Sequence, residues 1–223
     1  MRLDEKIKHS KIIIDRIYSE YEVVLIANSL GKDSVVVAEL CRQVLAERGE
    51  LNRLKMFWIR TPMKPAESLD LKLELEDWWN AQIEVHMSES KVIEGIWERS
   101  PDLCCEIFKV RPWKEAIKNA DVVVTGLRRD EGKTRHEYQE EESYIDGMTK
   151  LNPILIWTER EVWHFTAAYR LPVHPFYKEG YRSLGCVPCS KIIDENEPER
   201  AGRWAGTSKC GGECGIHTLA KGD

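Results

Sequence analysis

The sequence predicts a single α/β domain whose mostly parallel central sheet is flanked by helices on both faces, followed by an irregular C-terminal tail. Short, wholly apolar runs, such as residues 23–27 and 122–124, are typical of strands that are buried on both faces. They alternate with longer segments whose apolar residues recur at helical spacing, as in a parallel sheet with helical crossovers. The 223 residues show no linker and no repeat, so we expect one domain. Its α/β core would span residues 1–170 and its tail residues 171–223.

The individual elements follow from the same alternation. Strands are predicted at 22–28, 54–59, 82–86 and 121–125, with a hairpin of 140–144 and 149–154. Helices are predicted at 3–19, 35–47, 67–80, 89–99, 106–118 and 158–168. Asp146-Gly147 is a strong hairpin turn signal, and Thr158 with Glu161 forms a capping box. Cys104 is expected in a short loop and Cys41 in the core.

Composition and charge restrict the class of protein. With 42% hydrophobic and 32% charged residues, the chain is typical of soluble globular proteins. It lacks the roughly 18 consecutive apolar residues of a membrane span, and its charged N-terminus lacks the apolar core of a signal peptide. We therefore expect a cytoplasmic protein. The net charge of −5 opposes general nucleic-acid binding but permits a local basic pocket.

A predicted strand, a glycine turn and a helix start form a possible phosphate-binding loop at residues 29–34. Backbone N–H groups and the positive end of a helix dipole converge on an anion in such a turn. Gly31 would permit close approach, the Lys32-Asp33 pair would place charge at the site, and the hydroxyls of Ser29 and Ser34 would add donors. The alternative is an ordinary strand–helix turn with a serine N-cap.

A second loop, residues 126–135, follows the predicted strand at 121–125. It carries Arg128, Arg129, Thr134 and Arg135. Because carboxyl ends of parallel strands meet at one edge of a sheet, this loop should lie beside the phosphate-binding loop. The sequence therefore predicts a basic clamp for an anion. A solvated charged loop is the alternative.

Seven cysteines in a reducing compartment indicate metal or redox chemistry rather than disulfides. Cys186 and Cys189 have the C-x-x-C spacing that lets two sulfurs bind one metal centre. Cys104 and Cys105 could complete four thiolates. Such a set suits either zinc or an iron–sulfur cluster, and an adjacent pair favours the cluster.

These segments together resemble the adenylylsulfate and phosphoadenylylsulfate reductases of sulfate assimilation, within the adenine nucleotide alpha hydrolase superfamily. The resemblance covers nearly the whole chain. Its closing motif, Glu213-Cys214-Gly215-Ile216-His217 after Arg200-Ala201-Gly202-Arg203-Trp204, is the most specific part. The other matching segments are 29–34, 104–105 with 109–110, 125–129 with 134–135, 152–154 with Trp157, and 180–189.

The resemblance implies thioredoxin-dependent reduction of adenylylsulfate to sulfite and AMP. In such enzymes the cysteine matched by Cys214 attacks the sulfonucleotide and becomes an S-sulfocysteine, from which thioredoxin or a glutaredoxin-like reductant releases sulfite. Lys109, Arg200, Arg203 and His217 are the matched residues for balancing charge around sulfate and thiolate. The alternative for Cys214 is an unreactive tail thiol.

The resemblance also implies a cofactor. Members with both cysteine pairs carry a 4Fe–4S cluster and usually prefer adenylylsulfate, which makes Cys104, Cys105, Cys186 and Cys189 the implied ligands. We further expect a homo-oligomer, with no membrane or nucleic-acid partner. Glycines around Cys214 predict a flexible segment that closes over the substrate and reopens to the reductant.

Other functions remain open from the sequence alone. The first alternative is reduction of phosphoadenylylsulfate, releasing adenosine 3′,5′-bisphosphate. The second is an ATP-dependent sulfur transferase resembling tRNA thiolases, because the loop keeps Lys32 and Asp33, which related reductases commonly lack. A third is a zinc-stabilised nucleotide sensor without catalysis. Two local departures from the reductase pattern are the segment 60–68, which lacks an expected acidic residue, and Cys210, which could pair with Cys214.

Overall fold

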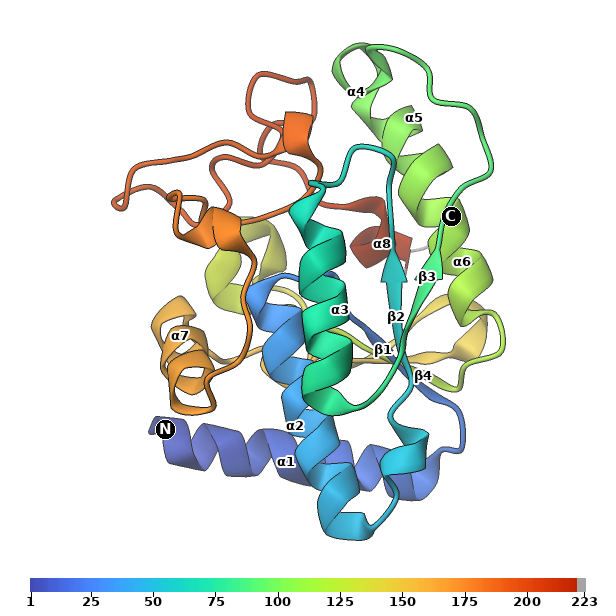
Figure 1. Cartoon of the computed structure of the whole chain (residues 1–223), viewed down its shortest axis with the longest axis vertical. Coiled ribbons are helices and arrows are strands. Elements are labelled where there is room, and N and C mark those ends of the chain that lie inside the picture. The colour runs from blue at the N-terminus through green and yellow to red at the C-terminus, as the bar shows by residue number, and fades with distance from the viewer. Residues whose placement is uncertain (220–223) are drawn as a thin grey trace.

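The sheet of the computed structural model has six strands in the order β3-β2-β1-β4-β6-β5 (Figure 1). They are β1 (Val24–Ala27), β2 (Met56–Ile59), β3 (Ile83–His86), β4 (Val122–Val124), β5 (Glu141–Ser143) and β6 (Thr149–Leu151). All neighbouring pairs are parallel except β5 with β6, which form the predicted hairpin. The structure describes residues 1–219. The mostly parallel sheet confirms the predicted fold class.

Helices cover both faces of this sheet. They are α1 (Leu3–Glu20), α2 (Lys32–Arg48), α3 (Glu67–Trp79), α4 (Ile96–Arg99), α5 (Pro101–Cys105), α6 (Arg111–Ile117), α7 (Glu159–Ala168) and α8 (Gly215–Thr218). Val122 and Val124 of β4 pack into the larger apolar cluster with α1, α2 and α7, whereas Val123 packs into a second cluster with α6 and α8. The alternation explains why every residue of this strand is apolar.

Several predicted details hold in the structure. In α7, the Glu161 backbone N–H donates to Thr158 Oγ1 at 3.3 Å, and the Thr158 N–H donates to the Glu161 carboxylate at 2.7 Å. The hairpin turn has positive φ at Asp146 (53°) and Gly147 (78°), as the Asp-Gly pair indicated. Cys41 is fully buried in the core.

Three boundaries differ from the prediction. Helix α2 begins at Lys32 with Gly31 as its N-cap, three residues earlier than expected, so the second half of the loop motif lies in the first helical turn. The predicted helix 89–99 is helical only over α4, because Val92 and Ile93 are exposed and give it no apolar face. Cys104 and Cys105 lie in α5 rather than in a loop. Pro101 occupies the first turn of that helix, where its missing N–H costs nothing.

The tail lies over the carboxyl ends of the strands (Figure 1, orange to red). Its regular elements within the described residues are short turns and α8, as predicted for an irregular segment. Ser190 and Arg203 form an isolated antiparallel bridge that holds two parts of the tail together. None of the helices within residues 1–219 is both long and apolar enough to cross a membrane.

Candidate active site

A cavity lies beneath the tail, at the carboxyl ends of β1, β2 and β4. Most of the predicted functional residues line it: Ser29, Gly31, Lys32, Asp33, Ser34, Cys104, Cys105, Lys109, Arg135, Cys186, Cys189, Arg200, Arg203, Cys214 and His217. Arg128, Arg129 and Thr134 are not among its lining residues. The two predicted loops meet as expected, since a Cβ on Gly126 would lie 2.8 Å from the backbone of Asp33. Glycine therefore permits the loop after β4 to reach the start of α2.

Cys214 is a buried thiol with a cation beside it. Its residue is 3% exposed. Burial alone would raise the pKa of Cys214, but the charge of the Lys109 ammonium lowers the pKa below its ordinary value. Lys109 lies in a π-helical turn, Glu106–Val110, between α5 and α6. The arrangement favours the nucleophilic thiolate.

The segment that carries Cys214 is fixed on both sides. The Tyr138 hydroxyl donates to the His217 carbonyl at 2.9 Å, and the Tyr144 hydroxyl donates to the Ile216 carbonyl. A Cβ on Gly215 would lie 2.8 Å from Cγ2 of Val110, so the absence of a side chain lets the segment pack against the Lys109 turn. These contacts place the thiol next to Lys109.

His217 differs from its expected role as a charge-balancing cation. Burial, assisted by Arg135, holds the pKa of His217 well below its ordinary value, although Glu213 opposes the shift. Its Nδ1 is buried without a hydrogen-bond partner among the described residues. His217 is therefore a neutral imidazole near neutral pH, and it offers the cavity a hydrogen-bonding nitrogen rather than a charge.

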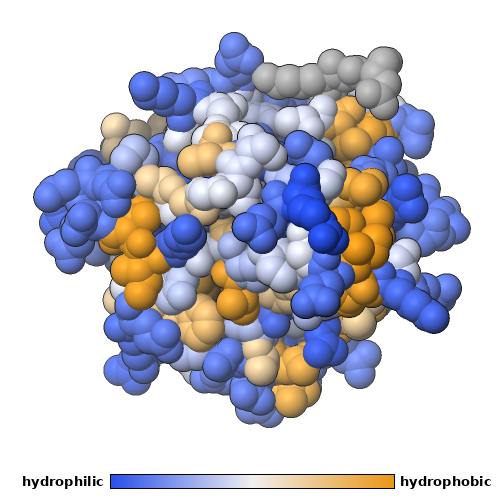
Figure 2. Space-filling view, turned by 90° about the horizontal axis from the view of Figure 1, so that it is seen from above, coloured by the Kyte–Doolittle hydropathy of each residue, from blue (hydrophilic) through white to orange (hydrophobic). Residues whose placement is uncertain are grey.

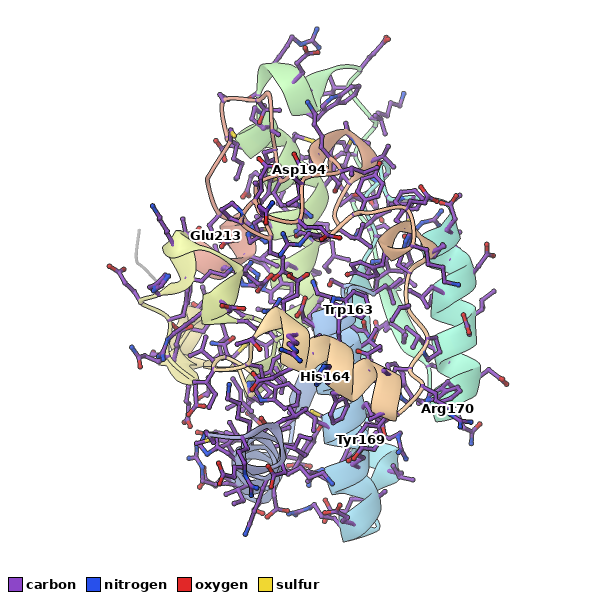
Figure 3. All side chains as sticks on the ribbon, turned by 90° about the vertical axis from the view of Figure 1, so that its left-hand side faces the viewer. Trp163, His164, Tyr169, Arg170, Asp194 and Glu213 are labelled. Carbon is purple, nitrogen blue, oxygen red and sulfur yellow. The ribbon has the colours of Figure 1, made fainter. Side chains whose placement is uncertain are left out.

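Glu213 forms ion pairs with two of the expected anion-binding arginines. Its carboxylate accepts from Arg135 at 2.8 and 3.1 Å and from Arg200 at 2.9 Å. Burial would raise the pKa of Glu213, but Arg135 above all holds it far below the ordinary range. Figure 3 shows Glu213 against the turns of residues 129–135. The Thr134 hydroxyl donates to the same carboxylate at 3.3 Å, so this hydroxyl already has a hydrogen-bond partner.

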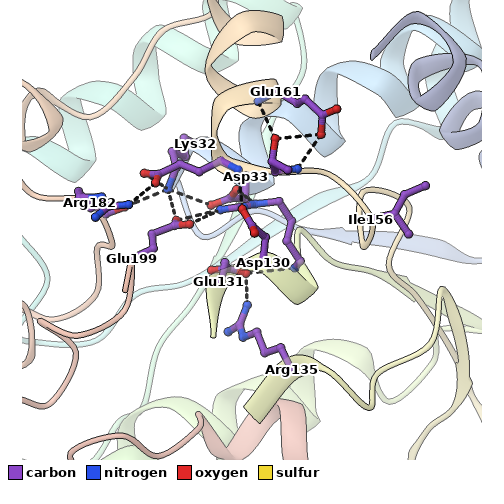
Figure 4. Close-up of polar contacts among 12 residues, drawn as sticks. Lys32, Asp33, Asp130, Glu131, Arg135, Ile156, Glu161, Arg182 and Glu199 are labelled. Atoms are coloured by element: carbon purple, nitrogen blue, oxygen red, sulfur yellow. Dashed lines mark hydrogen bonds and ion pairs between the residues drawn. The ribbon is translucent and has the colours of Figure 1, made fainter. Parts of the chain in front are cut away.

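A second buried network holds the motif residues of α2 (Figure 4). The Lys32 side chain is 0% exposed and its ammonium pairs with Glu199. Arg128, equally buried, bonds Asp33 at 2.6 Å and Glu199 at 2.7 Å. The expectation that the side chains of Lys32 and Arg128 bind phosphate is therefore not met in this arrangement. Glu199, just before the R-A-G-R-W motif, went unrecognised in the sequence because its partners are remote.

Groups of the predicted phosphate-binding loop also form hydrogen bonds within the protein. The Lys32 N–H donates to the Tyr177 hydroxyl at 2.9 Å, and Ser34 Oγ donates to the Asn28 side-chain oxygen at 3.1 Å. Ser29 and Ser34 hydroxyls lie 3.2 Å apart. The Arg129 side chain donates to the Tyr138 carbonyl at 2.9 Å and so stabilises the loop rather than lining the cavity. Tyr177 is a further lining residue that no sequence pattern indicated.

Three cations of the cavity have no carboxylate partner within residues 1–219: Lys64, Lys109 and Arg203. The guanidinium of Arg203 lies over the Trp204 ring at 4.8 Å and against Gly185, where a Cβ would lie 2.2 Å from its nitrogens. Burial, with Lys109 and Arg203 nearby, lowers the pKa of Lys64 to about 8 despite the Cys186 thiol. Sequence reasoning noted the unusual segment 60–68 without recognising Lys64.

The four predicted metal ligands line the same cavity, two from α5 and two from the tail. Burial and then the neighbouring Cys105, Cys186 and Cys189 raise the pKa of Cys104 to about 12. Such thiols lose their protons when a metal supplies positive charge. All four are free thiols, so the donor set fits a thiolate-bound centre.

Four thiolates can bind either a tetrahedral zinc or a multinuclear cluster in which each cysteine binds a different metal atom. The donor set fits both kinds of centre.

Comparisons with known proteins agree with the fold. A phosphoadenylyl-sulfate reductase of Candida auris, solved with phosphate, superposes with a TM-score of 0.68 at 16% identity, over 86% of this chain and 96% of that one. The FMN adenylyltransferase of Candida glabrata, solved with FMN and an ATP analogue, gives 0.68 at 16% identity, over 87% and 69%. The fold is therefore the adenine nucleotide alpha hydrolase-like fold that the sequence predicted.

Sequence comparisons define the family. Residues 23–192 match the phosphoadenosine phosphosulfate reductase domain. The chain is 31% identical over 217 residues to an adenosine 5′-phosphosulfate reductase of Allochromatium vinosum, covering 92% of this chain and 82% of that protein. A reductase of the same description from Bacillus cereus is 29% identical over 224 residues, covering 96% and 92%. The chain belongs to the phosphoadenosine phosphosulfate reductase family. It is an oxidoreductase that acts on sulfur groups, as predicted.

Proposed function

We propose that this enzyme reduces adenosine 5′-phosphosulfate to sulfite and AMP, with Cys214 as the nucleophile. The observation that carries the proposal is the buried Cys214 thiol in a cavity at the strand ends, with the ammonium of Lys109 lowering its pKa. The thiolate attacks the sulfur of the sulfuryl group, so a sulfur–sulfur bond forms. The sulfur–oxygen bond to the phosphate breaks, and AMP leaves with that electron pair.

A second step must release the bound group. A thiolate of an external dithiol, such as thioredoxin or a glutaredoxin-like protein, attacks Sγ of Cys214 and expels sulfite with the bonding electrons. The second thiol of that reductant then breaks the mixed disulfide, and the dithiol becomes a disulfide. This supplies the two electrons of the reduction. We also propose that the enzyme acts in the cytoplasm and forms a homo-oligomer.

Cys104, Cys105, Cys186 and Cys189 would hold a 4Fe–4S cluster. When bound, such a group would add fixed charge beside the sulfate-binding cations and hold α5 against the tail. Electrons need not pass through it, because thiol exchange accounts for both of them. The adjacent Cys104-Cys105 pair, which is unusual for zinc, supports this assignment over zinc.

The ATP-dependent sulfur transferase receives no support from the side chains that suggested it. Lys32 pairs with Glu199 and Asp33 with Arg128. A triphosphate or its magnesium ion would have to break these buried pairs, at a cost of several kcal/mol. The relatives named adenosine 5′-phosphosulfate reductase favour the substrate without a 3′-phosphate over phosphoadenylylsulfate.

The test is a single turnover without reductant. Mixing the enzyme with adenosine 5′-phosphosulfate should add one SO3 group to Cys214 and release one equivalent of AMP, measured by peptide mass mapping and chromatography. Cys214→Ser should bind nucleotide without forming the adduct, while Cys210→Ser should still form it. An adduct on Cys210, or sulfite release without any adduct, would contradict the assignment.

A further inference from the structure

We propose that Lys64 binds the sulfuryl group of the substrate, as a third cation beside Lys109 and Arg203. The inference rests on the proposed function and assigns a specificity-determining residue to its site. Lys64 follows β2, in a turn closed by its backbone N–H donating to the Thr61 carbonyl at 3.2 Å. It lines the cavity together with Cys186 and Cys214.

The charges of the cavity leave cations that an anionic group of the substrate can join. The acidic side chains that line it are Asp33 and Glu131, and both are paired with arginines, Asp33 with Arg128 and Glu131 with Arg135. Lys64, Lys109 and Arg203 share no such partner among residues 1–219. Three neighbouring cations in a buried site repel one another unless an anion joins them.

The position of Lys64 indicates which part of the substrate it binds. Lys64 lines the cavity with Lys109, Cys186, Arg203 and Cys214, and its turn lies against the tail, where the Thr61 hydroxyl is 3.0 Å from the Cys186 sulfur. Cys214 is the proposed nucleophile, and Lys109 and Arg203 are the cations expected around the sulfuryl group. Lys64 should therefore contact the sulfuryl oxygens, which the product AMP lacks.

The backbone holds Lys64 in this place. The Val187 N–H, between the two tail cysteines, donates to the Met63 carbonyl at 2.8 Å. Pro65 on the other side is buried. The turn is thus fixed against the cysteine-bearing segment of the tail, so the ammonium is directed into the cavity before the substrate arrives.

Paired affinities test the proposal. In Lys64→Met, binding of adenosine 5′-phosphosulfate should weaken about tenfold to a hundredfold, the loss of one charged hydrogen bond. Binding of AMP should change less than threefold. Using Cys214→Ser as the background prevents turnover during titration calorimetry. Lys64→Arg should keep most of the discrimination, and Lys91→Met, at an exposed loop position, should match the unsubstituted protein.

The outcomes separate the two proposals. If Lys64→Met weakens both ligands equally, or neither, Lys64 does not bind the sulfuryl group. If the Lys64→Met variant loses iron or unfolds, the Lys64→Arg variant is used instead. If Lys64→Arg does not bind adenosine 5′-phosphosulfate in preference to AMP as the unsubstituted protein does, the proposal is also overturned. Adduct formation by the unsubstituted enzyme tests the proposed function independently, and it can succeed whatever Lys64 does.

Discussion

At the scale of single residues, the reactivity of Cys214 is a balance between burial and one cation. Burial disfavours the thiolate, while Lys109 favours it and prevails. The same contact raises the pKa of Lys109 against its own burial, so each partner stabilises the charged form of the other. The thiol is therefore activated before substrate binds.

Lys109→Met should reverse this balance. With the ammonium gone, burial raises the pKa of Cys214, so a smaller fraction of the thiol is ionised at any pH below the new pKa. The rate of Cys214 alkylation by iodoacetamide, followed by peptide mass mapping, should reach half its maximum at a higher pH. Lys114→Met, at an exposed position on α6, is the control. An unchanged pH profile would show that Lys109 does not activate the thiol.

Glu213 should contribute to stability in a pH-dependent way. Its folded pKa lies below the unfolded value of about 4.3, so its stabilising effect is present above that pH and is lost as the pH falls toward the folded pKa. Glu213→Gln should cost about 1.5–3 kcal/mol at pH 7. Urea unfolding at several pH values should show this difference narrowing below pH about 4. A constant difference would contradict the role of its charge.

The sequence predicted which residues lie in the cavity more accurately than how they are paired. Short contiguous sequence motifs identified Cys214, Lys109 and Arg203. The partners of Lys32 and Arg135 were not identified in this way, because Glu199 and Glu213 are brought to them by the tail. A loop motif shows which charged side chains the loop carries, but not which remote carboxylate pairs with them.

At the scale of elements, one buried ion network joins α2, the loop after β4 and the tail. Glu199 links Lys32 of α2 to Arg128 of the loop. Each side chain is nearly or fully buried, so each charge depends on the others for its solvation. The network fixes the tail to the start of α2.

Glu199→Ala should destabilise the protein strongly. It leaves Lys32 without its nearest carboxylate and Arg128 with Asp33 and the more distant Asp130. Breaking a buried pair costs about 3–5 kcal/mol. The midpoint of urea denaturation should fall accordingly. Glu195→Ala, at an exposed position of the same segment, should change it by less than about 0.5 kcal/mol. Equal midpoints for the two variants would mean that the network does not stabilise the fold.

Most elements could be predicted because their periodicity reflects burial on one or both faces. In the strands of the sheet and in the capped α7, the pattern of apolar residues matches the faces that are buried. Residues 89–95 failed because their apolar side chains, such as Val92, face solvent. The five-residue helix with Cys104 and Cys105 was too short for a periodic signal, and its Pro101 start was overlooked.

At the scale of the whole molecule, the four proposed cluster ligands come from two parts of the chain that lie far apart in sequence. Cys104 and Cys105 come from α5, and Cys186 and Cys189 from the tail. Viewed from above, outside the grey residues, the atoms of this end form a largely continuous surface in which hydrophobic patches are separate (Figure 2). The predicted opening of the tail would therefore be needed for the reductant to reach the buried Cys214.

Removal of the proposed cluster should loosen the tail before it loosens the core. A metal held by both segments stabilises their contact by its binding free energy, whereas α1 and α2 rest on the larger apolar cluster. The metal-bound protein should contain about four irons. After anaerobic iron chelation, hydrogen exchange of residues 181–217 should accelerate, while exchange in α2 stays slow.

Cys186→Ser should reproduce the chelated state, and Cys41→Ser, in the core but outside the cavity, should retain the iron even if it lowers stability. Lys32 and Arg128 continue to tie the tail to α2 through Glu199 in the chelated protein. The segment nearest Glu199 should therefore stay more protected than the segment around Cys186 and Cys189. Uniform exchange across the tail and core after iron removal would mean that the metal supports the whole fold rather than the junction of α5 with the tail.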